Sequence, residues 1–231
     1  MILIIPDVHG RDFYEPMLQR EWDHVIFLGD YLDPYPHEGN TMTTALERMQ
    51  HIIEYKLTNG ERVTLLTGNH DLHYSSPHAM MLPKCSRYDF LRAPEIEDLF
   101  ATNRDLFSLA WETSIAGKRY MFSHAPVLQR WLSRHSDIIA GFDADSLNAI
   151  LYTFEGDRAL VEVSSQRGGM SDCGSMVWAD INEVVPGALP PAAYQIVGHT
   201  QLVHAPIITN EIACLDCRRC FALDESGIHE I

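Results

Sequence analysis

The sequence contains no apolar run that could cross a membrane. A spanning helix needs about 18 or more consecutive apolar residues, whereas the apolar start of the chain, Met1–Pro6, runs directly into Asp7. This start is too short for a signal peptide and has no basic flank, so it predicts a buried first strand. We therefore expect a cytoplasmic protein that does not associate with membranes.

Basic residues are also scarce, because 17 Lys and Arg stand against 32 Asp and Glu, giving a formal charge of −15. Non-specific binding to nucleic acid needs a basic footprint, and anionic membrane surfaces attract basic segments. Neither partner is expected here. A local positive site remains compatible with this composition, because bound metal ions supply charge that a residue count omits.

Cysteines are few and odd in number, which argues against a disulfide framework and favours a reducing compartment. Cys214, Cys217 and Cys220 form a C-x-x-C-x-x-C pattern. A structural metal site needs four ligands, so Cys85 or Cys173 would have to complete it from far away in the sequence. We favour buried cysteines that behave as small hydrophobes, with metal binding as the weaker alternative.

Apolar runs and helical spacing alternate in the first third of the chain. Continuous apolar runs predict buried strands at Ile2–Ile5, His24–Leu28 and Arg62–Leu66. Between the last two, apolar residues recur from Met42 to Ile53 at spacings of three and four, and Asn59-Gly60 supplies a helix stop. Strand–helix–strand alternation predicts a parallel sheet with right-handed crossovers. A chain of 231 residues fits one domain, residues 1–231.

The remaining elements are predicted from shorter patterns. The expected helices are Pro94–Leu109, Val127–Arg134 and Ser146–Phe154. A hairpin is expected from Trp111–Ile115 and Lys118–Phe122 around Ala116-Gly117, and Ser164–Ser175 is expected to be a loop. Short strands are expected at Tyr194–Val197, Pro206–Thr209, Ile212–Leu215 and Phe221–Leu223.

Five polar clusters each follow a predicted strand. They are Asp7-Val8-His9-Gly10, Gly29-Asp30-Tyr31-Leu32-Asp33, Gly68-Asn69-His70-Asp71, Ser123-His124 and Gly198-His199-Thr200. Because sites in α/β sheets lie outside the carboxyl ends of the strands, we expect these clusters to converge. Any one of them alone could be a turn or a solvated histidine. The ordered set of five is a much stronger indication.

The chemistry of these clusters points to metal binding. Their Asp, His and Asn side chains, without thiolates, suit divalent manganese, iron or zinc. The candidates exceed the needs of one ion and fit a binuclear centre with a bridging carboxylate. They are Asp7, His9, Asp30, Asn69, His70, His124 and His199.

This ordered set resembles the calcineurin-like metallophosphoesterases, and within them the bacterial phosphoprotein (Ser/Thr) phosphatase branch. The resemblance extends from Asp7 to about Asp216. It implies an α/β fold, a four-layer αββα sandwich of two mixed β-sheets flanked by helices. It also implies that Asp7 and His9 bind the first metal ion and that Asp30 bridges both ions. Asn69, His124 and His199 would bind the second ion. His70 would be the catalytic histidine, paired with Asp33.

Two motifs depart from the pattern of that branch, and one position agrees with it. Its members usually carry Arg-Gly after the second aspartate, where this chain has Pro34-Tyr35. Their third motif usually ends in Glu, where this chain has Asp71. Many broader family members carry a second His two residues after the last ligand, where this chain has Gln201, as in the protein phosphatases. The first two departures weaken the case for a phosphoprotein substrate and leave the metal site untouched.

The function implied is hydrolysis of phosphate monoesters, on a phosphoprotein or a small phosphorylated metabolite. We expect in-line attack by a hydroxide held between two divalent metal ions. His70, oriented by Asp33, would protonate the leaving group. Manganese is the first expectation for the metals, with iron, zinc, cobalt or nickel as alternatives.

With the usual arginine missing, another residue must hold the phosphate. Arg167, followed by two glycines, is the first candidate because guanidinium binds phosphate with two prongs. Arg11 is the second, and Asn69 would also contact substrate. The segment Tyr74–Arg92, with mixed aromatic and basic residues, is a candidate lid. Trp178-Ala179-Asp180 is either near the site or a core tryptophan with a capping aspartate.

Two other functions remain open at this point. A phosphodiesterase or dinucleoside-polyphosphate hydrolase would use the same metal centre on a different leaving group, and substrate choice is set by loops. A non-catalytic protein-binding scaffold would be expected to lose ligands or the catalytic histidine, and this chain keeps all of them. The sequence does not identify the metals, the substrate or the oligomeric state.

Overall fold

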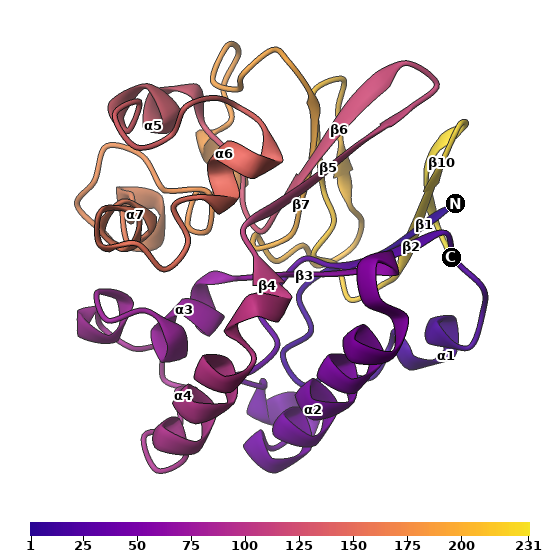
Figure 1. The fold of residues 1–231 in the computed structure, drawn as a ribbon, viewed down its shortest axis with the longest axis vertical. Coiled ribbons are helices and arrows are strands. Elements are labelled where there is room, and N and C mark those ends of the chain that lie inside the picture. The colour runs from indigo at the N-terminus through magenta and orange to yellow at the C-terminus, as the bar shows by residue number, and fades with distance from the viewer. The chain divides into compact units, whose positions relative to one another are not determined.

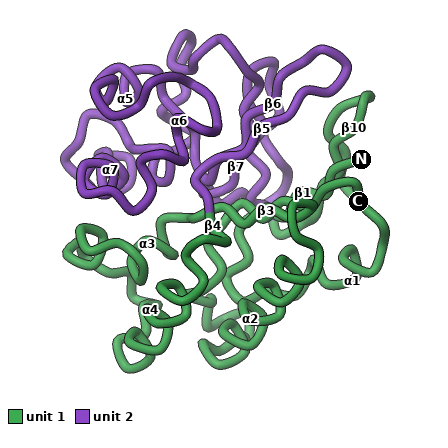
Figure 2. The backbone as a smooth tube through the Cα atoms, in the orientation of Figure 1, with its two compact units in different colours: residues 1–107, 218–231 green, residues 108–217 purple.

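The computed structural model describes residues 1–231, which form two compact units (Figure 2). Unit 1 contains residues 1–107 and 218–231, and unit 2 contains residues 108–217. The chain therefore leaves unit 1 once and returns to it at the end. None of its helices has the length and apolar character that a membrane span requires. The expectation of a single domain stays a prediction.

Unit 1 is built on a six-stranded sheet in the order β11-β10-β1-β2-β3-β4. Its strands are β1 Ile2–Ile5, β2 His24–Phe27, β3 Val63–Leu66, β4 Phe107–Ser108, β10 Phe221–Asp224 and β11 Gly227–Glu230. The central strands β1, β2 and β3 pair in parallel, whereas β10 pairs with β1 antiparallel. The parallel sheet predicted for the first third of the chain is confirmed, within a sheet that is mixed overall.

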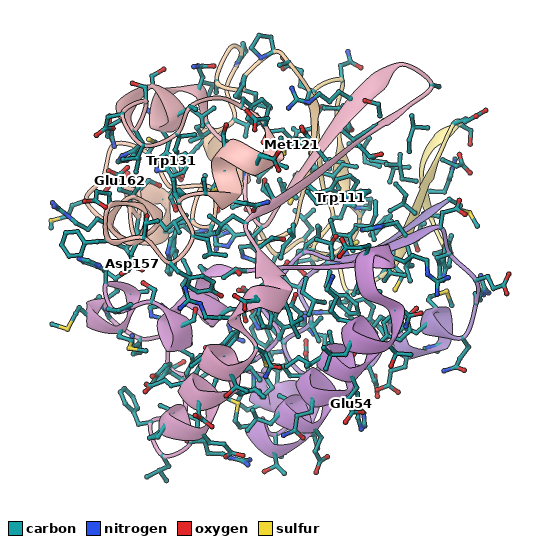
Figure 3. The ribbon with its side chains drawn as sticks, viewed as in Figure 1. Glu54, Trp111, Met121, Trp131, Asp157 and Glu162 are labelled. Carbon is teal, nitrogen blue, oxygen red and sulfur yellow. The ribbon has the colours of Figure 1, made fainter.

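Helices of unit 1 cover this sheet on the side where α2 and α4 lie in Figure 1. They are α1 Glu15–Leu18, α2 Met42–Asn59, α3 Asn69–Ser75 and α4 Ala93–Thr102. Helix α2 begins with a capping box between Thr41 and Thr44 and ends at Gly60, as its sequence predicts. Its apolar face joins the core that includes Leu3 and Phe27, while Glu54 lies on the exposed face (Figure 3).

Unit 2 contains a five-stranded sheet in the order β5-β6-β7-β9-β8. Its strands are β5 Ala110–Ile115, β6 Lys118–Ser123, β7 Tyr194–Val197, β8 Ile207–Ile208 and β9 Ile212–Cys214. The predicted hairpin is confirmed, and Ala116 and Gly117 both have positive φ, as a tight two-residue turn requires. Strand β7 pairs in parallel with β6 and with β9, so the sheet is mixed.

The helices of unit 2 gather together in Figure 1. They are α5 Gln129–Arg134, α6 Ala144–Asn148 and α7 Phe154–Leu160. The fully buried Trp131 on α5 donates from Nε1 to the carbonyl of Ala159 on α7 (3.2 Å). Arg134 of α5 pairs with Glu162 just after α7 (2.9 Å), so two polar contacts join these helices. Trp131 and Glu162 lie in this part of unit 2 in Figure 3.

Short 3₁₀ helices complete the elements: Pro36–Glu38, Gly60–Arg62, Ala79–Met81, Arg104–Leu106, Ser165–Arg167 and Ile181–Glu183. The one at Ser165–Arg167 is the only regular helical turn in the predicted loop Ser164–Ser175, which is otherwise irregular as expected. The short strands predicted for the C-terminal third are all present, with bounds within a residue or two. Sequence analysis missed the helices α1 and α3 and the strands β4 and β11.

Two helix predictions need correction. The helix expected at Pro94–Leu109 ends at Thr102, because a 3₁₀ turn and strand β4 follow. The range expected to be a helix, Ser146–Phe154, is helical only as far as Asn148, where α6 ends, and the next helix, α7, begins at Phe154 and was not predicted. Asp143 caps the first by accepting from Ser146 N, and Thr153 caps the second by accepting from Gly156 N. Between them the left-handed Tyr152 (φ 64°) breaks the helical path. The α/β fold with two mixed sheets flanked by helices is confirmed.

Candidate functional site

The first three polar clusters lie at the carboxyl ends of parallel strands in unit 1. His9 follows β1, Asp30 follows β2, and Asn69 and His70 open helix α3 directly after β3. The backbone N–H of His9 donates to the Asp30 carbonyl (2.7 Å), and that of His70 donates to Asp30 Oδ1 (2.9 Å). The predicted convergence of these clusters is therefore observed within this unit.

Several site residues have an uncommon backbone conformation. Of the seven non-glycine residues with positive φ, four are predicted site residues: His9 (45°), Asp30 (53°), Asp33 (57°) and His199 (64°). Left-handed conformations cost free energy for residues with a Cβ, although Asp and His tolerate them better than most. Such positions concentrate at functional sites, where the surrounding structure holds them in place.

His9 is prepared to act as a neutral ligand. Its Nδ1 donates to the carbonyl of Leu32 (2.8 Å), which leaves Nε2 as the acceptor nitrogen, 3.5 Å from Asp30 Oδ2. Burial lowers the pKa of His9 to about 3, despite the opposing effect of the Asp30 charge. A neutral imidazole whose other nitrogen is anchored by a carbonyl is the usual arrangement of a metal-binding histidine.

Backbone around Asp30 is held by Asp71. The Asp71 carboxylate accepts from the backbone N–H groups of Asp30 (2.8 Å), Tyr31 (3.1 Å) and Gly68 (2.8 Å). Gly68 in turn has no room for a side chain, since a Cβ there would overlap the Asp30 carboxylate and lie 2.6 Å from its backbone nitrogen. Asp71, a departure from the usual Glu, thus orders the second and third clusters together.

His70 and Asp33 form a close pair. His70 Nδ1 donates to Asp33 Oδ2 (2.6 Å), and the Tyr74 hydroxyl donates to Asp33 Oδ1 (2.6 Å). Burial raises the pKa of Asp33, but the hydrogen bonds from these two partners and the His70 charge hold it below its usual range. Burial lowers the pKa of His70, yet the charges of Asp30 and Asp33 outweigh this effect and hold it well above its usual range.

Unit 2 contributes the last two histidines. His124 follows β6 and His199 follows the adjacent parallel strand β7. His124 Nε2 and His199 Nδ1 lie 3.2 Å apart, and both side chains are buried. The ring of Trp178 packs edge-on against His199, with centroids 6.1 Å apart. These two imidazoles are therefore brought together in the way that sequence analysis expected of ligands to one metal.

Arg167 lies beside His199, also in unit 2. Its Nε pairs with Asp180 Oδ2 (2.7 Å), and its Nη2 donates to Thr200 Oγ1 (3.0 Å) and to the His199 carbonyl (3.3 Å). Asp180 also accepts from the backbone N–H of Asn182 as a helix cap. Both interpretations of Trp178 and Asp180 thus hold in part, because the aspartate caps a helix and the tryptophan contacts a predicted ligand.

Arg11 is buried in unit 1 and committed to a carboxylate. Its guanidinium contacts both oxygens of Glu38 (2.7 and 3.2 Å) and donates to the Asp7 carbonyl (3.3 Å). Such a two-pronged ion pair leaves few donors for a ligand. That Arg11 binds substrate stays a prediction, and this geometry weakens it.

Sequence analysis missed Arg87. Its Nη1 donates to the Asp33 carbonyl, its Nη2 lies 3.4 Å from His70 Nε2, and its Cζ lies 3.7 Å from the centroid of the Tyr35 ring. The only indication in the sequence was that Arg87 falls in the candidate lid Tyr74–Arg92. Spacing gave no reason to choose it over the other basic residues there.

The three cysteines of the C-x-x-C-x-x-C pattern are all buried, and none of them forms a disulfide. Cys214 Sγ donates to the Gly198 carbonyl (3.3 Å), and Cys220 belongs to the apolar core of unit 1. Burial raises the pKa of the Cys220 thiol to about 12. These environments support the interpretation of the cysteines as small buried hydrophobes.

The donor set fits divalent metal ions. In unit 1, ligand atoms of His9, Asp30 and His70 all lie within 4.8 Å of one another, and Asp7 and Asn69 are buried in the same unit. The donors are carboxylate, amide and imidazole groups without thiolates, which suits manganese, iron or zinc. The predicted ligands are divided between the two units, and their assembly into one binuclear centre stays a prediction.

Comparisons with known proteins identify a family and similar folds. The family model described as calcineurin-like phosphoesterase matches residues 1–200. A cold-active protein tyrosine phosphatase is similar in structure, with a TM-score of 0.59 and 14% identity over 99% of this chain and 78% of the other. A protein serine/threonine phosphatase from Saccharomyces cerevisiae has a TM-score of 0.52 and 14% identity over 96% of this chain and 72% of the other. At this identity the structural likeness shows the fold alone. No curated protein matches the chain.

Proposed function

The chain belongs to the calcineurin-like phosphoesterase family of metal-dependent hydrolases of phosphoester bonds, and from this premise we propose that it hydrolyses phosphate monoesters. The substrate would be a phosphoprotein or a small phosphorylated metabolite. Two divalent ions, manganese first, would be the cofactors. Asp7 and His9 would hold one ion, Asp30 would contact both, and the second ion would be held by the remaining predicted ligands, Asn69, His124 and His199.

When bound, two divalent ions lower the pKa of a water molecule and stabilise charge on the phosphoryl oxygens. The protein's own contribution is to orient these ligands. Leu32 fixes the tautomer of His9 through its carbonyl. The N–H of His70 and the space left by Gly68 fix the direction of the Asp30 carboxylate.

The pair of His70 and Asp33 is the observation that carries the proposal. Asp33 accepts from His70 Nδ1 and is itself held by the Tyr74 hydroxyl. The imidazole is therefore fixed with Nε2 directed away from its carboxylate, available to pass a proton to a leaving alkoxide. A positioned general acid contributes roughly 10²- to 10⁴-fold in rate. A metal-binding protein without catalytic activity would not need this arrangement.

His70→Asn tests the proposal. We expect turnover of a nitrophenyl phosphate to fall by about 10²- to 10⁴-fold, while elemental analysis still finds the wild-type metal content. His51→Asn, on the exposed face of α2, is the matched control and should keep full activity. Loss of the metals with unchanged activity per bound metal would instead make His70 a ligand and contradict its catalytic role.

The same protein should be offered bis-nitrophenyl phosphate, phosphopeptides and dinucleoside polyphosphates. A clear preference for the monoester substrates supports the proposal. Faster hydrolysis of the diester or the dinucleoside polyphosphate would favour the alternative, in which the same metal centre acts on a different leaving group. Repeating the panel after metal removal and reloading with manganese, iron, zinc, cobalt or nickel would identify the preferred ion.

A further inference from the structure

The guanidinium of Arg87 lies beside the catalytic pair without a carboxylate partner. We propose that Arg87 binds the phosphoryl group of the substrate and that Tyr35 positions it; this assignment rests on the proposed phosphatase function. It gives the role of substrate-binding arginine to a residue outside the five polar clusters. It also assigns a structural role to Tyr35, which belongs to the Pro34-Tyr35 pair found where the phosphatase branch usually has Arg-Gly.

The contacts of Arg87 place it on the reactive side of His70. Its Nη2 is 3.4 Å from His70 Nε2, the nitrogen opposite the one bonded to Asp33. Its Nη1 donates to the Asp33 backbone carbonyl. A phosphoryl group whose leaving oxygen meets Nε2 would therefore lie within reach of this guanidinium, which can offer two parallel N–H donors to two phosphoryl oxygens.

Tyr35 holds the guanidinium in this place. The Arg87 Cζ lies 3.7 Å from the Tyr35 ring centroid, a distance typical of a stacked cation–π contact. The ring is itself fixed by His9, edge-on at 5.2 Å, and by Arg11, whose Cζ is 5.0 Å away. Arg11 is itself held by its ion pair with Glu38. The Tyr35 ring on which Arg87 stacks is therefore fixed by buried residues of unit 1.

A second contact fixes the segment that carries Arg87. The ring of Tyr88 stacks on that of Tyr74 with centroids 4.5 Å apart and an interplanar angle of 9°. Tyr74 is the residue whose hydroxyl donates to Asp33. The position of Arg87 is thus coupled to the catalytic carboxylate through its neighbour in sequence as well as through Tyr35.

The other candidate arginines are already neutralised. Arg11 is bonded to Glu38 and Arg167 to Asp180, whereas Arg87 donates to a backbone carbonyl and lies beside an imidazole nitrogen. A guanidinium has five N–H donors, so Arg87 keeps N–H donors and an uncompensated positive charge for an anion. Charge complementarity therefore favours Arg87 as the phosphate ligand.

The test is binding of inorganic phosphate to the metal-loaded protein by calorimetry, together with KM and kcat on nitrophenyl phosphate. Arg87→Ala should weaken phosphate binding by about 10- to 100-fold, the range expected for one charged hydrogen-bonding partner, with metal content unchanged. Added guanidinium ion should restore part of the lost activity. Tyr35→Leu should weaken phosphate binding in the same direction, and Tyr35→Phe, which keeps the ring, should not.

Arg92→Ala is the matched control, because Arg92 ends the same segment and pairs with Glu95 at the surface; it should bind phosphate like the wild type. Unchanged phosphate binding in Arg87→Ala, or a loss in Arg167→Ala alone, would overturn the proposal. If the wild type hydrolyses no phosphate ester while Arg87→Ala still weakens phosphate binding, the phosphatase function fails and the arginine assignment stands.

Discussion

Gly68 leaves space for the carboxylate of Asp30, a proposed metal ligand. A methyl group there would overlap the Asp30 carboxylate, and Asp30 is the proposed bridge between the ions. We predict that Gly68→Ala displaces this carboxylate and lowers metal content from two ions to one or none, measured by elemental analysis of the purified protein. Turnover should fall in proportion.

The matched control for this prediction is Gly117→Ala, in the hairpin turn. A Cβ there meets no atom within 4 Å, although the positive φ of 78° makes the change strained. It should cost about 1 kcal/mol of stability and leave metal content intact. If Gly68→Ala binds metal as well as Gly117→Ala does, the close approach to Asp30 has no role in forming the site.

At the scale of elements, the pairing of β2 with β3 includes a half-buried histidine. His24 Nε2 lies 2.9 Å from Thr64 Oγ1, and burial lowers the pKa of His24 from 6.5 to about 4, with Lys56 adding to the effect. The imidazole of His24 is therefore harder to protonate in the folded state than in the unfolded chain, where its pKa is 6.5. The contribution of neutral His24 to the free energy of unfolding is complete above pH 6.5 and is lost as the pH falls toward 4.

His24→Gln should therefore lose less stability on acidification. We predict that urea midpoints measured at pH 7, 5.5 and 4 fall less steeply for this variant than for the wild type, since glutamine can still bond Thr64 without titrating. His51→Gln, on the exposed face of α2, is the control and should follow the wild type. Parallel pH profiles for His24→Gln and the wild type would show that this strand pairing does not sense pH.

The boundaries of a helix are harder to predict from sequence than its existence. The regular apolar spacing and capping of α2 made its full length predictable from sequence. The break between α6 and α7 depends instead on two capping side chains and on the left-handed Tyr152. Apolar spacing does not report a positive φ, so the non-helical residues between Asn148 and Phe154 were predicted to be helical and α7 was missed.

For the whole molecule, metal binding should contribute to stability. The proposed ligands belong to both units, with Asp7, His9, Asp30 and Asn69 in unit 1 and His124 and His199 in unit 2. A ligand that binds only the folded state stabilises it by about 2.7 kcal/mol at 100 times its dissociation constant. We predict that chelation lowers the unfolding temperature measured by calorimetry and that manganese restores it.

His70→Asn should show the same dependence on manganese, because it removes a proposed catalytic group, whereas Asp30→Asn should show little or none. An unfolding temperature that chelator and manganese leave unchanged in the wild type would argue against a metal centre formed on folding.

Much of the candidate site was predictable because its residues follow strands directly. An apolar run followed by Asp-x-His, Gly-Asp or Gly-Asn-His predicts a strand and places a polar group at its carboxyl end. Parallel pairing of the strands then brings these polar groups together. His9, Asp30 and His70 met in unit 1 as expected for this reason, as did His124 and His199 in unit 2.

The sequence by itself determined most of the strands, the helix α2, the acidic charge and the polar residues that follow the predicted strands, because these depend on local patterns of a few residues. Only the tertiary structure decided which arginine lies beside His70, the proposed general acid. Arg87 reaches His70 from a segment without regular spacing, and a stacked ring 52 positions away in sequence holds it there. Contacts of this kind arise from packing between distant segments, and no local pattern encodes them.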